Sequence, residues 1–202
     1  MEDAIATLGG YLDAGQWRTL RQFAELLHLW TAKINLVAPD DRDNLGTKHL
    51  VPALLMGGAV AMVPHRTILD FGSGGGIPGI PLKVMFADSS MTLVESRRRK
   101  SNFLREVVRS LALERVTVVN KRLEDWPPPP GGVDVVVSRA TAHPAELARL
   151  VAPFLAPHGV LVTTVGKRSW DSRANLRLLL DTTMSWPGAT VTIGALDARH
   201  VH

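Results

Sequence analysis

Residues 67–83, TILDFGSGGGIPGIPLK, decide the fold of this chain. An apolar segment enters a cluster of glycines, and apolar residues resume from Ile80 onward. The pattern predicts a strand, a tight turn and the start of a helix. Such a turn needs glycine because its backbone visits positive φ and because no Cβ can stand between the backbone and a ligand. We therefore expect a loop that holds a nucleotide cofactor.

Charges beside the loop indicate which cofactor it holds. The dinucleotide fingerprint G-x-G-x-x-G can be placed on Gly74, Gly76 and Gly79, but counted from the first glycine of the loop its third glycine falls on Ile77. Asp70, directly before the loop, would repel a pyrophosphate but attract an ammonium or sulfonium group. S-adenosylmethionine carries both of these cations. It is therefore the predicted cofactor, and an NAD-dependent oxidoreductase is disfavoured.

A second acid, Glu95, ends the next apolar run. It follows the glycines by about 20 residues, the offset expected of a ribose-binding carboxylate, and its two oxygens can accept from both ribose hydroxyls. The alternative is an ordinary glycine-rich turn beside two exposed acids. The agreement of the loop, both acids and the strand pattern favours the cofactor site.

Short apolar runs alternate with helical patterns from Arg66 onward. The runs are continuous in Val, Ile and Leu, which is typical of parallel strands buried on both faces. We expect strands at residues 67–71, 91–94, 116–119, 133–137 and 159–165, and one more strand with a turn within 190–202. We expect helices at residues 80–86, 97–113, 142–155 and 170–180.

The predicted architecture is a doubly wound α/β domain, a Rossmann-like sheet with helices on both faces. Ligands of such sheets bind beyond the carboxyl ends of the strands. The polar residues at the ends of the first four strands should therefore gather at one edge: Asp70, Glu95, Asn120 and Ser138.

The N-terminal part predicts helices that precede the cofactor domain. Within residues 16–30, apolar side chains recur at helical spacing. Residues 50–64 are uncharged but fewer than the ~20 needed to cross a bilayer, which indicates a buried helix. We divide the chain into a helical cap segment, 1–64, and a cofactor-binding core, 65–202, within one compact domain.

Composition excludes several classes of protein. The 202 residues contain no cysteine, which excludes disulfides and thiolate metal sites, and the histidines lack a metal-ligating spacing. We expect no metal. The start of the chain lacks the basic segment and apolar core of a signal peptide, so we expect a cytoplasmic protein that binds no membrane. The net charge of +4 suggests an anionic partner.

Five strings in the chain, LDFGSGGGIPGIPLK, TLVESRRRKSNFL, RLEDW, VDVVVSRA and LDARH, resemble the bacterial small-subunit ribosomal RNA guanine-N7 methyltransferases, the family of glucose-inhibited division protein B. The resemblance extends from Trp30 to the C-terminus. It implies a class I methyltransferase fold, S-adenosylmethionine as cofactor, and small-subunit ribosomal RNA or a ribosomal particle as partner. It also implies that the cap covers the active site, because Trp30, Asn35, Leu36 and His49 match family positions. Taken alone, His49 is equally compatible with a hydrogen-bonded histidine at a helix start.

The resemblance also implies cofactor contacts. Leu123 and Glu124 match the family pair that flanks the adenine, although taken alone they would indicate a helix start with an ordinary acid. The complete predicted cofactor-binding set is Asp70, Gly72, Gly74, Ile77, Glu95, Leu123, Glu124 and Arg139.

Ser138 and Arg139 end the strand VDVVVS, beside the predicted position of the methyl donor. Enzymes that methylate exocyclic amines usually place Asn or Asp, two prolines and an aromatic residue here, so Ser-Arg-Ala argues against such an acceptor. Guanine N7 has a free lone pair and needs no base to remove a proton. Arg139, the predicted catalytic residue, can hold the target base or the cofactor carboxylate with its planar fork. The alternative is an arginine paired with a neighbouring acid.

Cations open the helix that follows Glu95. Arg98, Arg99 and Lys100 oppose the helix macrodipole, so helix stability explains them poorly. Phosphate binding explains them better, and we predict that they contact RNA together with Lys167. The alternative is a solvated helix face.

These observations predict a monomeric S-adenosylmethionine-dependent methyltransferase that acts on guanine N7 of small-subunit ribosomal RNA. Two alternatives stay open. One is a divergent methyltransferase of another RNA or of a small molecule, and the other is a non-catalytic nucleic-acid-binding relative that kept the pocket. Analogy of fold cannot separate them.

Overall fold

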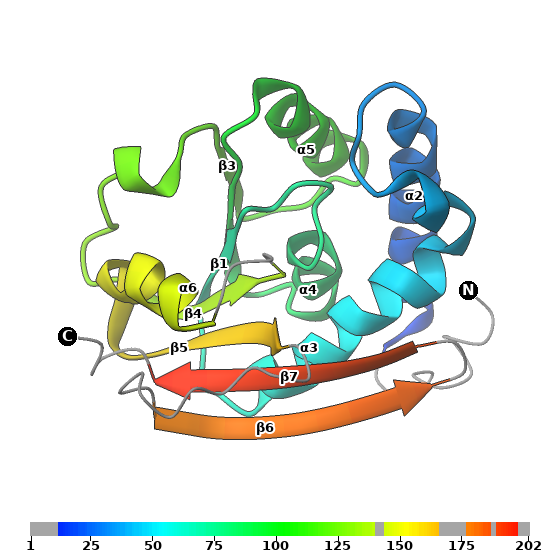
Figure 1. Cartoon of the computed structure of the whole chain (residues 1–202). Helices are drawn as coiled ribbons and strands as arrows, with labels where there is room; N and C mark the ends of the chain where they lie inside the picture. Colours follow the sequence, from blue (N-terminus) through cyan, green and yellow to red (C-terminus); the bar gives the residue numbers. More distant parts are fainter. Residues whose placement is uncertain (1–11, 140–143, 166–176, 187–188, 198–202) are drawn as a thin grey trace.

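The computed structural model describes residues 12–139, 144–165, 177–186 and 189–197 (Figure 1). Its α-helices are α2 (Ala14–Thr31), α3 (Val51–Ala61), α4 (Gly79–Met85), α5 (Arg98–Ser110) and α6 (Pro144–Val151). Its short helices are η1 (Pro39–Asn44), η2 (Gly46–Leu50, a π-helix), η3 (Leu123–Asp125) and η4 (Ala152–Phe154). Its strands are β1 (Thr67–Phe71), β2 (Ser90–Val94), β3 (Val116–Val119), β4 (Val133–Ser138), β5 (Leu155–Val165), β6 (Arg177–Trp186) and β7 (Ala189–Asp197). No helix in these ranges is long and apolar enough to span a membrane.

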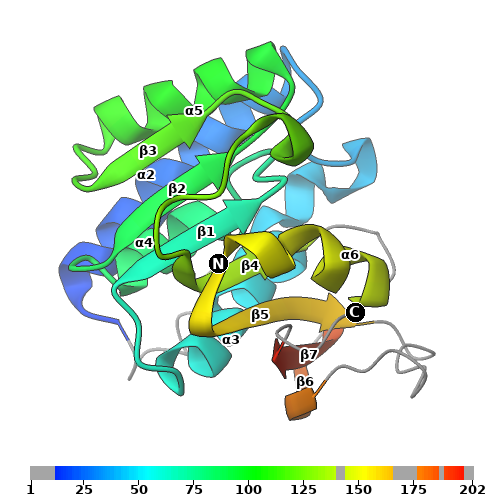
Figure 2. The same ribbon diagram turned by 90° about the vertical axis from the view of Figure 1, so that its left-hand side faces the viewer.

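The strands form one seven-stranded sheet in the order β3-β2-β1-β4-β5-β7-β6 (Figure 2). Strands β1 to β5 pair in parallel, and β7 is antiparallel to both of its neighbours. The predicted doubly wound α/β class is confirmed. Strand order reverses between β1 and β4, which is where ligands of such sheets bind.

Strands β1, β2, β4 and β5 bury side chains on both faces of the sheet, whereas the edge strand β3 is only partly buried. Ile68 and Val137 lie in a core with α3, α4 and α5, whereas Leu69 and Val136 lie in a second core with α6. Figure 1 shows α6 on one side of the sheet and α4 and α5 on the other. Because successive side chains of a strand point to opposite faces, burial of both faces requires the continuous apolar runs seen in the sequence.

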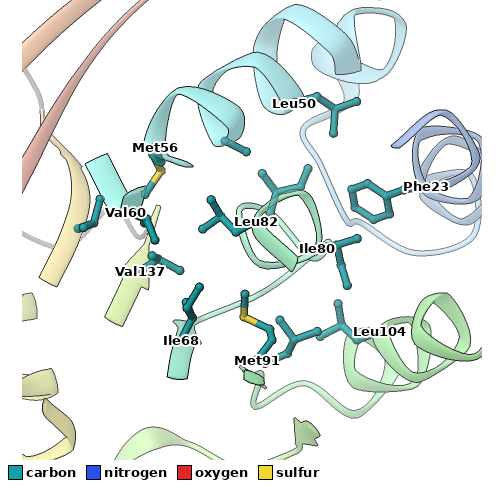
Figure 3. Close-up of a cluster of buried hydrophobic side chains, with 14 of the residues drawn as sticks. Phe23, Leu50, Met56, Val60, Ile68, Ile80, Leu82, Met91, Leu104 and Val137 are labelled. Carbon is teal, nitrogen blue, oxygen red and sulfur yellow. The ribbon is translucent and has the colours of Figure 1, made fainter. Parts of the chain in front are cut away.

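The N-terminal helices share the larger core with the sheet. Phe23 of α2 and Met56 of α3 point into the same cluster as Ile68 of β1 (Figure 3). Gln16 completes a capping box at the start of α2, and its Nε2 donates to the Val84 carbonyl of α4 at 2.8 Å. The cap is therefore packed directly onto the elements that carry the glycine loop.

Two expected helices are wrong in part. Residues 177–180, within the helix expected at 170–180, belong to β6, and residues 170–176 lie outside the described ranges. Pairing of β6 with β7 over nine residue pairs overrides the local helical pattern. The helix expected to reach residue 155 ends at Val151, because Pro153 turns the chain through η4 into β5. The strand expected near the end of the chain is β7.

Candidate active site

The loop after β1 adopts the conformation for which its glycines are required. Gly72, Gly74 and Gly76 have φ of 74°, 53° and 80°, values that residues with a side chain rarely adopt. A Cβ at Gly72 would meet no atom within 4 Å, so the space beside this residue is open. A Cβ at Gly75 would crowd Leu27 and Leu36 of the N-terminal segment. The loop thus fits closely under the cap while leaving room for a ligand.

Glu95 holds the glycine loop to the start of α5. One carboxylate oxygen, Oε2, accepts from the Gly74 backbone N–H at 3.0 Å, and Oε1 accepts from the Arg97 N–H at 2.7 Å. The side chain is buried. Each oxygen keeps a second lone pair, so the predicted bonds to ribose hydroxyls are compatible with these contacts.

Asp70 lies buried behind the loop, with 1% of its surface exposed. Its Oδ2 accepts from the Gly79 N–H at 3.0 Å at the start of α4, while Oδ1 has no hydrogen-bond partner among the described residues. Burial raises the pKa of Asp70 to about 7, against the opposing effects of the Ser73 side chain, the Gly79 hydrogen bond and the Arg139 charge. The sequence predicts this acid beside the cofactor. In the structure its carboxyl also links β1 to α4 through the Gly79 hydrogen bond.

Three distant segments enclose a pocket of about 230 Å³. Its lining residues come from the loop, from the cap and from Arg139 at the end of β4. The lining residues are Leu36, Val37, His49, Gly72, Ser73, Gly74, Gly75, Ile77 and Arg139. Four predicted cofactor residues therefore line one pocket, and Asp70 and Glu95 support it from behind the loop.

Arg139 reaches from the sheet to the cap. Its Nη1 lies 3.4 Å from His49 Nδ1 and 3.4 Å from the His49 carbonyl, and its Nη2 lies 3.3 Å from the Lys48 carbonyl. Within the described residues it forms no ion pair, which disfavours the reading of Arg139 as a salt-bridged strand end. Burial lowers the pKa of Arg139 while the nearby charges of Asp70 and Asp41 oppose that change.

His49 is the other titratable side chain lining the pocket. Its Nε2 lies 3.1 Å from Asp41 Oδ2 in η1. Burial and the charge of Arg139 lower the pKa of His49, against the opposing effect of Asp41. The imidazole therefore favours its neutral form at neutral pH.

The predicted adenine pair, Leu123 and Glu124, does not line this pocket. Both line a second pocket of about 340 Å³, where Trp126 and Phe154 stack with ring centroids 5.6 Å apart. Leu123 is buried in the core that contains α6. Asn120 does join the predicted edge, because its Nδ2 donates to the Glu95 carbonyl at 2.9 Å.

The predicted RNA-binding residues begin beside the pocket. Arg98 and Arg99 are exposed and Lys100 is half-buried at the start of α5, which begins three residues after Glu95. None of these three cations forms an ion pair among the residues that the structure describes. Lys167 lies outside those residues.

Comparison with known proteins identifies the family. The family model described as GidB, rRNA small subunit methyltransferase G, matches residues 16–184. The chain belongs to this family. A ribosomal RNA small subunit methyltransferase G of Gluconobacter oxydans (strain 621H) is 40% identical over 151 residues, which cover 74% of this chain and 75% of that protein. The corresponding protein of Geobacter sp. (strain M21) is 37% identical over 182 residues, which cover 90% of this chain and 83% of that protein.

A solved structure agrees with this assignment at the level of fold. A SAM-dependent methyltransferase from Aquifex aeolicus is similar with a TM-score of 0.55 at 17% identity, over 72% of this chain and 92% of that chain. This protein therefore has the Rossmann-like methyltransferase fold. No group of His, Asp or Glu side chains that could hold a metal ion occurs in the described part of the chain.

Two pocket features of this family member were not predicted from its sequence. Val37 lines the pocket, and Asp41 binds His49 from a 3₁₀ turn. Neither position belongs to a periodic pattern or a glycine motif, so no local signal distinguishes them. Only the folding of the cap over the glycine loop brings them to the site.

Ionisation of Asp70 should make stability depend on pH. Because its pKa is raised, the native state favours the protonated carboxyl over the ionised one. The stability that this preference contributes is fully present below about pH 4 and is lost as the pH rises through about 7. Each pKa unit corresponds to about 1.4 kcal/mol. In urea unfolding between about pH 5 and 8.5, we expect wild type to lose stability with rising pH and Asp70→Asn to lose much less.

Asp134→Asn is a matched control for this experiment. Burial alone would raise the pKa of Asp134, but hydrogen bonds from Arg66 and Thr67 lower it, so its contribution is already complete above about pH 5. This variant should keep the slope of wild type. An unchanged slope in Asp70→Asn would contradict the role assigned to Asp70.

Proposed function

We propose that this protein transfers the methyl group of S-adenosylmethionine to N7 of a guanine in small-subunit ribosomal RNA. Membership of the GidB family and the names of its relatives support ribosomal RNA methylation. The observation that carries the choice of acceptor is the lining of the pocket. Its titratable side chains are Arg139 and His49, and no carboxylate lines it among the described residues.

The residues around the pocket fit S-adenosylmethionine. The glycine loop exposes backbone at Gly72 and Gly74, Glu95 offers acceptor lone pairs for the ribose, and Asp70 places a carboxyl with an unpartnered Oδ1 behind the loop. A cation brought near Asp70 would favour its ionised form. Bound here, the cofactor supplies a methyl group on a positively charged sulfur. Leu123 and Glu124, in η3 after β3, remain proposed adenine contacts.

In the proposed reaction the residues of the protein position the reactants and do not remove a proton. A guanine N7 lone pair can attack a methyl group directly, whereas an exocyclic amine must also lose a proton. Ser138, at the end of β4, uses its hydroxyl to donate to the Phe71 carbonyl at 3.0 Å. Arg139 has spare donors beside the loop with which to orient the base or the cofactor carboxylate. Holding both reactants in line supplies the acceleration.

The exposed cations at the start of α5 extend the site toward a polyanion. Arg98 and Arg99 lie three and four residues after Glu95, whose carboxylate contacts the glycine loop, so phosphates bound there would lie near the pocket. We propose that the enzyme acts as a cytoplasmic monomer on RNA or on a ribosomal particle, and that Lys100 and Lys167 add to this surface.

Radiolabelled S-adenosylmethionine tests the function. The enzyme is incubated with small-subunit RNA and with particles from a strain that lacks this gene, and the labelled nucleotide is mapped by nuclease digestion. We expect 7-methylguanosine at a single site. Label on an exocyclic amine would contradict the proposed acceptor, and absence of transfer with intact cofactor binding would favour the non-catalytic alternative.

Glu95 should contribute directly to cofactor affinity. Glu95→Ala removes an ionised acceptor and the support of Gly74, so we expect binding of S-adenosylmethionine to weaken by about 1.5 to 3 kcal/mol. Isothermal titration calorimetry measures the change. Glu114→Gln, an exposed acid before the amino end of β3, is the control and should bind like wild type. Unchanged affinity in Glu95→Ala would remove the ribose-binding role.

The cations of α5 should determine the salt dependence of RNA binding. Replacing Arg98 and Arg99 by Glu should reduce the slope of log affinity against log salt concentration by the amount expected for about two lost phosphate contacts. Reversing Arg66 and Arg115, exposed cations at the amino ends of the strands, makes the same change in net charge and should leave the slope unaltered. Equal slopes in wild type and the Arg98/Arg99 variant would identify those cations as a solvated face.

A further inference from the structure

His49 lies between a donor-only group and an acceptor-only group from different parts of the fold. Asp41 in η1 offers carboxylate oxygens, with Oδ2 3.1 Å from Nε2. Arg139 at the end of β4 offers guanidinium N–H groups, with Nη1 3.4 Å from Nδ1. The histidine itself belongs to η2. One imidazole therefore joins two segments of the cap to the catalytic edge of the sheet.

The chemistry of the two partners defines the state of the imidazole. A guanidinium can only donate, so Nδ1 must present its lone pair, and a carboxylate accepts, so Nε2 must carry the proton. Only the neutral Nε2–H tautomer satisfies both contacts. A proton on Nδ1 would instead place an N–H against the guanidinium of Arg139.

All the described contacts of Arg139 are to neutral acceptors on the cap, and His49 Nδ1 is the one side-chain acceptor among them. The carbonyls of Lys48 and His49 lie 3.3 and 3.4 Å away, near the long limit for hydrogen bonds, and no carboxylate pairs with the guanidinium among the described residues. Asp70 lies buried behind the loop, and Lys48 is a further cation on η2. The guanidinium is thus directed by neutral acceptors on the cap and keeps donors for a ligand.

We propose that Asp41 and His49 are positioning residues for Arg139. Asp41 orients the ring and fixes its tautomer, and Nδ1 then holds the guanidinium over the glycine loop in the orientation that methyl transfer requires. This inference rests on the proposed function in so far as Arg139 acts on the base or the cofactor. It assigns to the cap a part in catalysis beyond covering the pocket.

Two amide substitutions of His49 separate its two contacts. The side-chain amide of Asn can place an oxygen near the position of Nδ1, whereas that of Gln reaches the position of Nε2. His49→Asn therefore keeps an acceptor for Arg139 and loses the contact with Asp41. His49→Gln keeps a partner for Asp41 and loses the acceptor for Arg139.

Methyl transfer distinguishes positioning from a purely structural role. We expect His49→Gln to lower kcat/KM about tenfold, the size of one lost hydrogen bond to a charged donor, and His49→Asn, which loses only the Asp41 contact, to lower it by about threefold. In an Arg139→Ala background the His49→Gln change should have little further effect. Equal losses in the two amide variants, or an undiminished effect without Arg139, would overturn the proposal. Urea midpoints of all variants show whether they are folded.

Nitrogen NMR of the histidine rings tests the tautomer without any substrate. With His49 assigned by its absence from the His49→Asn spectrum, we expect the neutral Nε2–H form at about pH 8, and we expect Asp41→Asn to weaken that preference. A proton on Nδ1 in wild type would overturn the proposal. If wild type transferred no methyl group to ribosomal RNA, the proposed function would fail, whereas this measurement would still decide the state of His49.

Discussion

The glycine loop is held in place by the end of the neighbouring strand, and the site depends on this attachment. The carbonyl of Val94 accepts from the N–H groups of both Gly72 and Ser73 at 3.0 Å, and the Glu95 carboxylate then accepts from Gly74. A loop rich in glycine has high conformational entropy when free, so it must be tied at several points to hold one shape. The parallel pairing of β1 with β2 supplies those points because both strands end at the same edge.

The same attachment gives Glu95 two tasks with one side chain. Its oxygens orient the backbone of the loop and of the start of α5, and each keeps a lone pair for the proposed contact with a ribose. The first cations of α5 follow within four residues, so the proposed cofactor and RNA contacts are close together in the sequence. The side-chain amide of Asn120, directly after β3, donates to the Glu95 carbonyl and so links the end of β3 to the end of β2.

The other half of the site depends on the cap. Leu36, Val37 and His49 line the pocket because α2 and α3 share a core with β1, and Gly75 has no side chain that would keep the cap away. The buried carboxyl of Asp70 and the guanidinium of Arg139 are costly for stability and are retained at the pocket. Polar groups held at such a cost are characteristic of functional sites.

The sequence by itself determined the parallel α/β sheet, the glycine loop and the acids and cations of its carboxyl edge. Local rules suffice for these features, because strand runs buried on both faces, glycines at positive φ and an acid at a fixed offset are all short-range patterns. The tertiary structure alone decided that residues 177–180 join a strand, that Leu123 packs in the second core, and that Asp41, His49 and Arg139 meet. Each of these depends on pairing or packing between segments far apart in the chain, and for Arg139 and His49 the separation is 90 residues. Such contacts leave no periodic pattern in the sequence, since they are specified by the shared core that brings the cap onto the sheet.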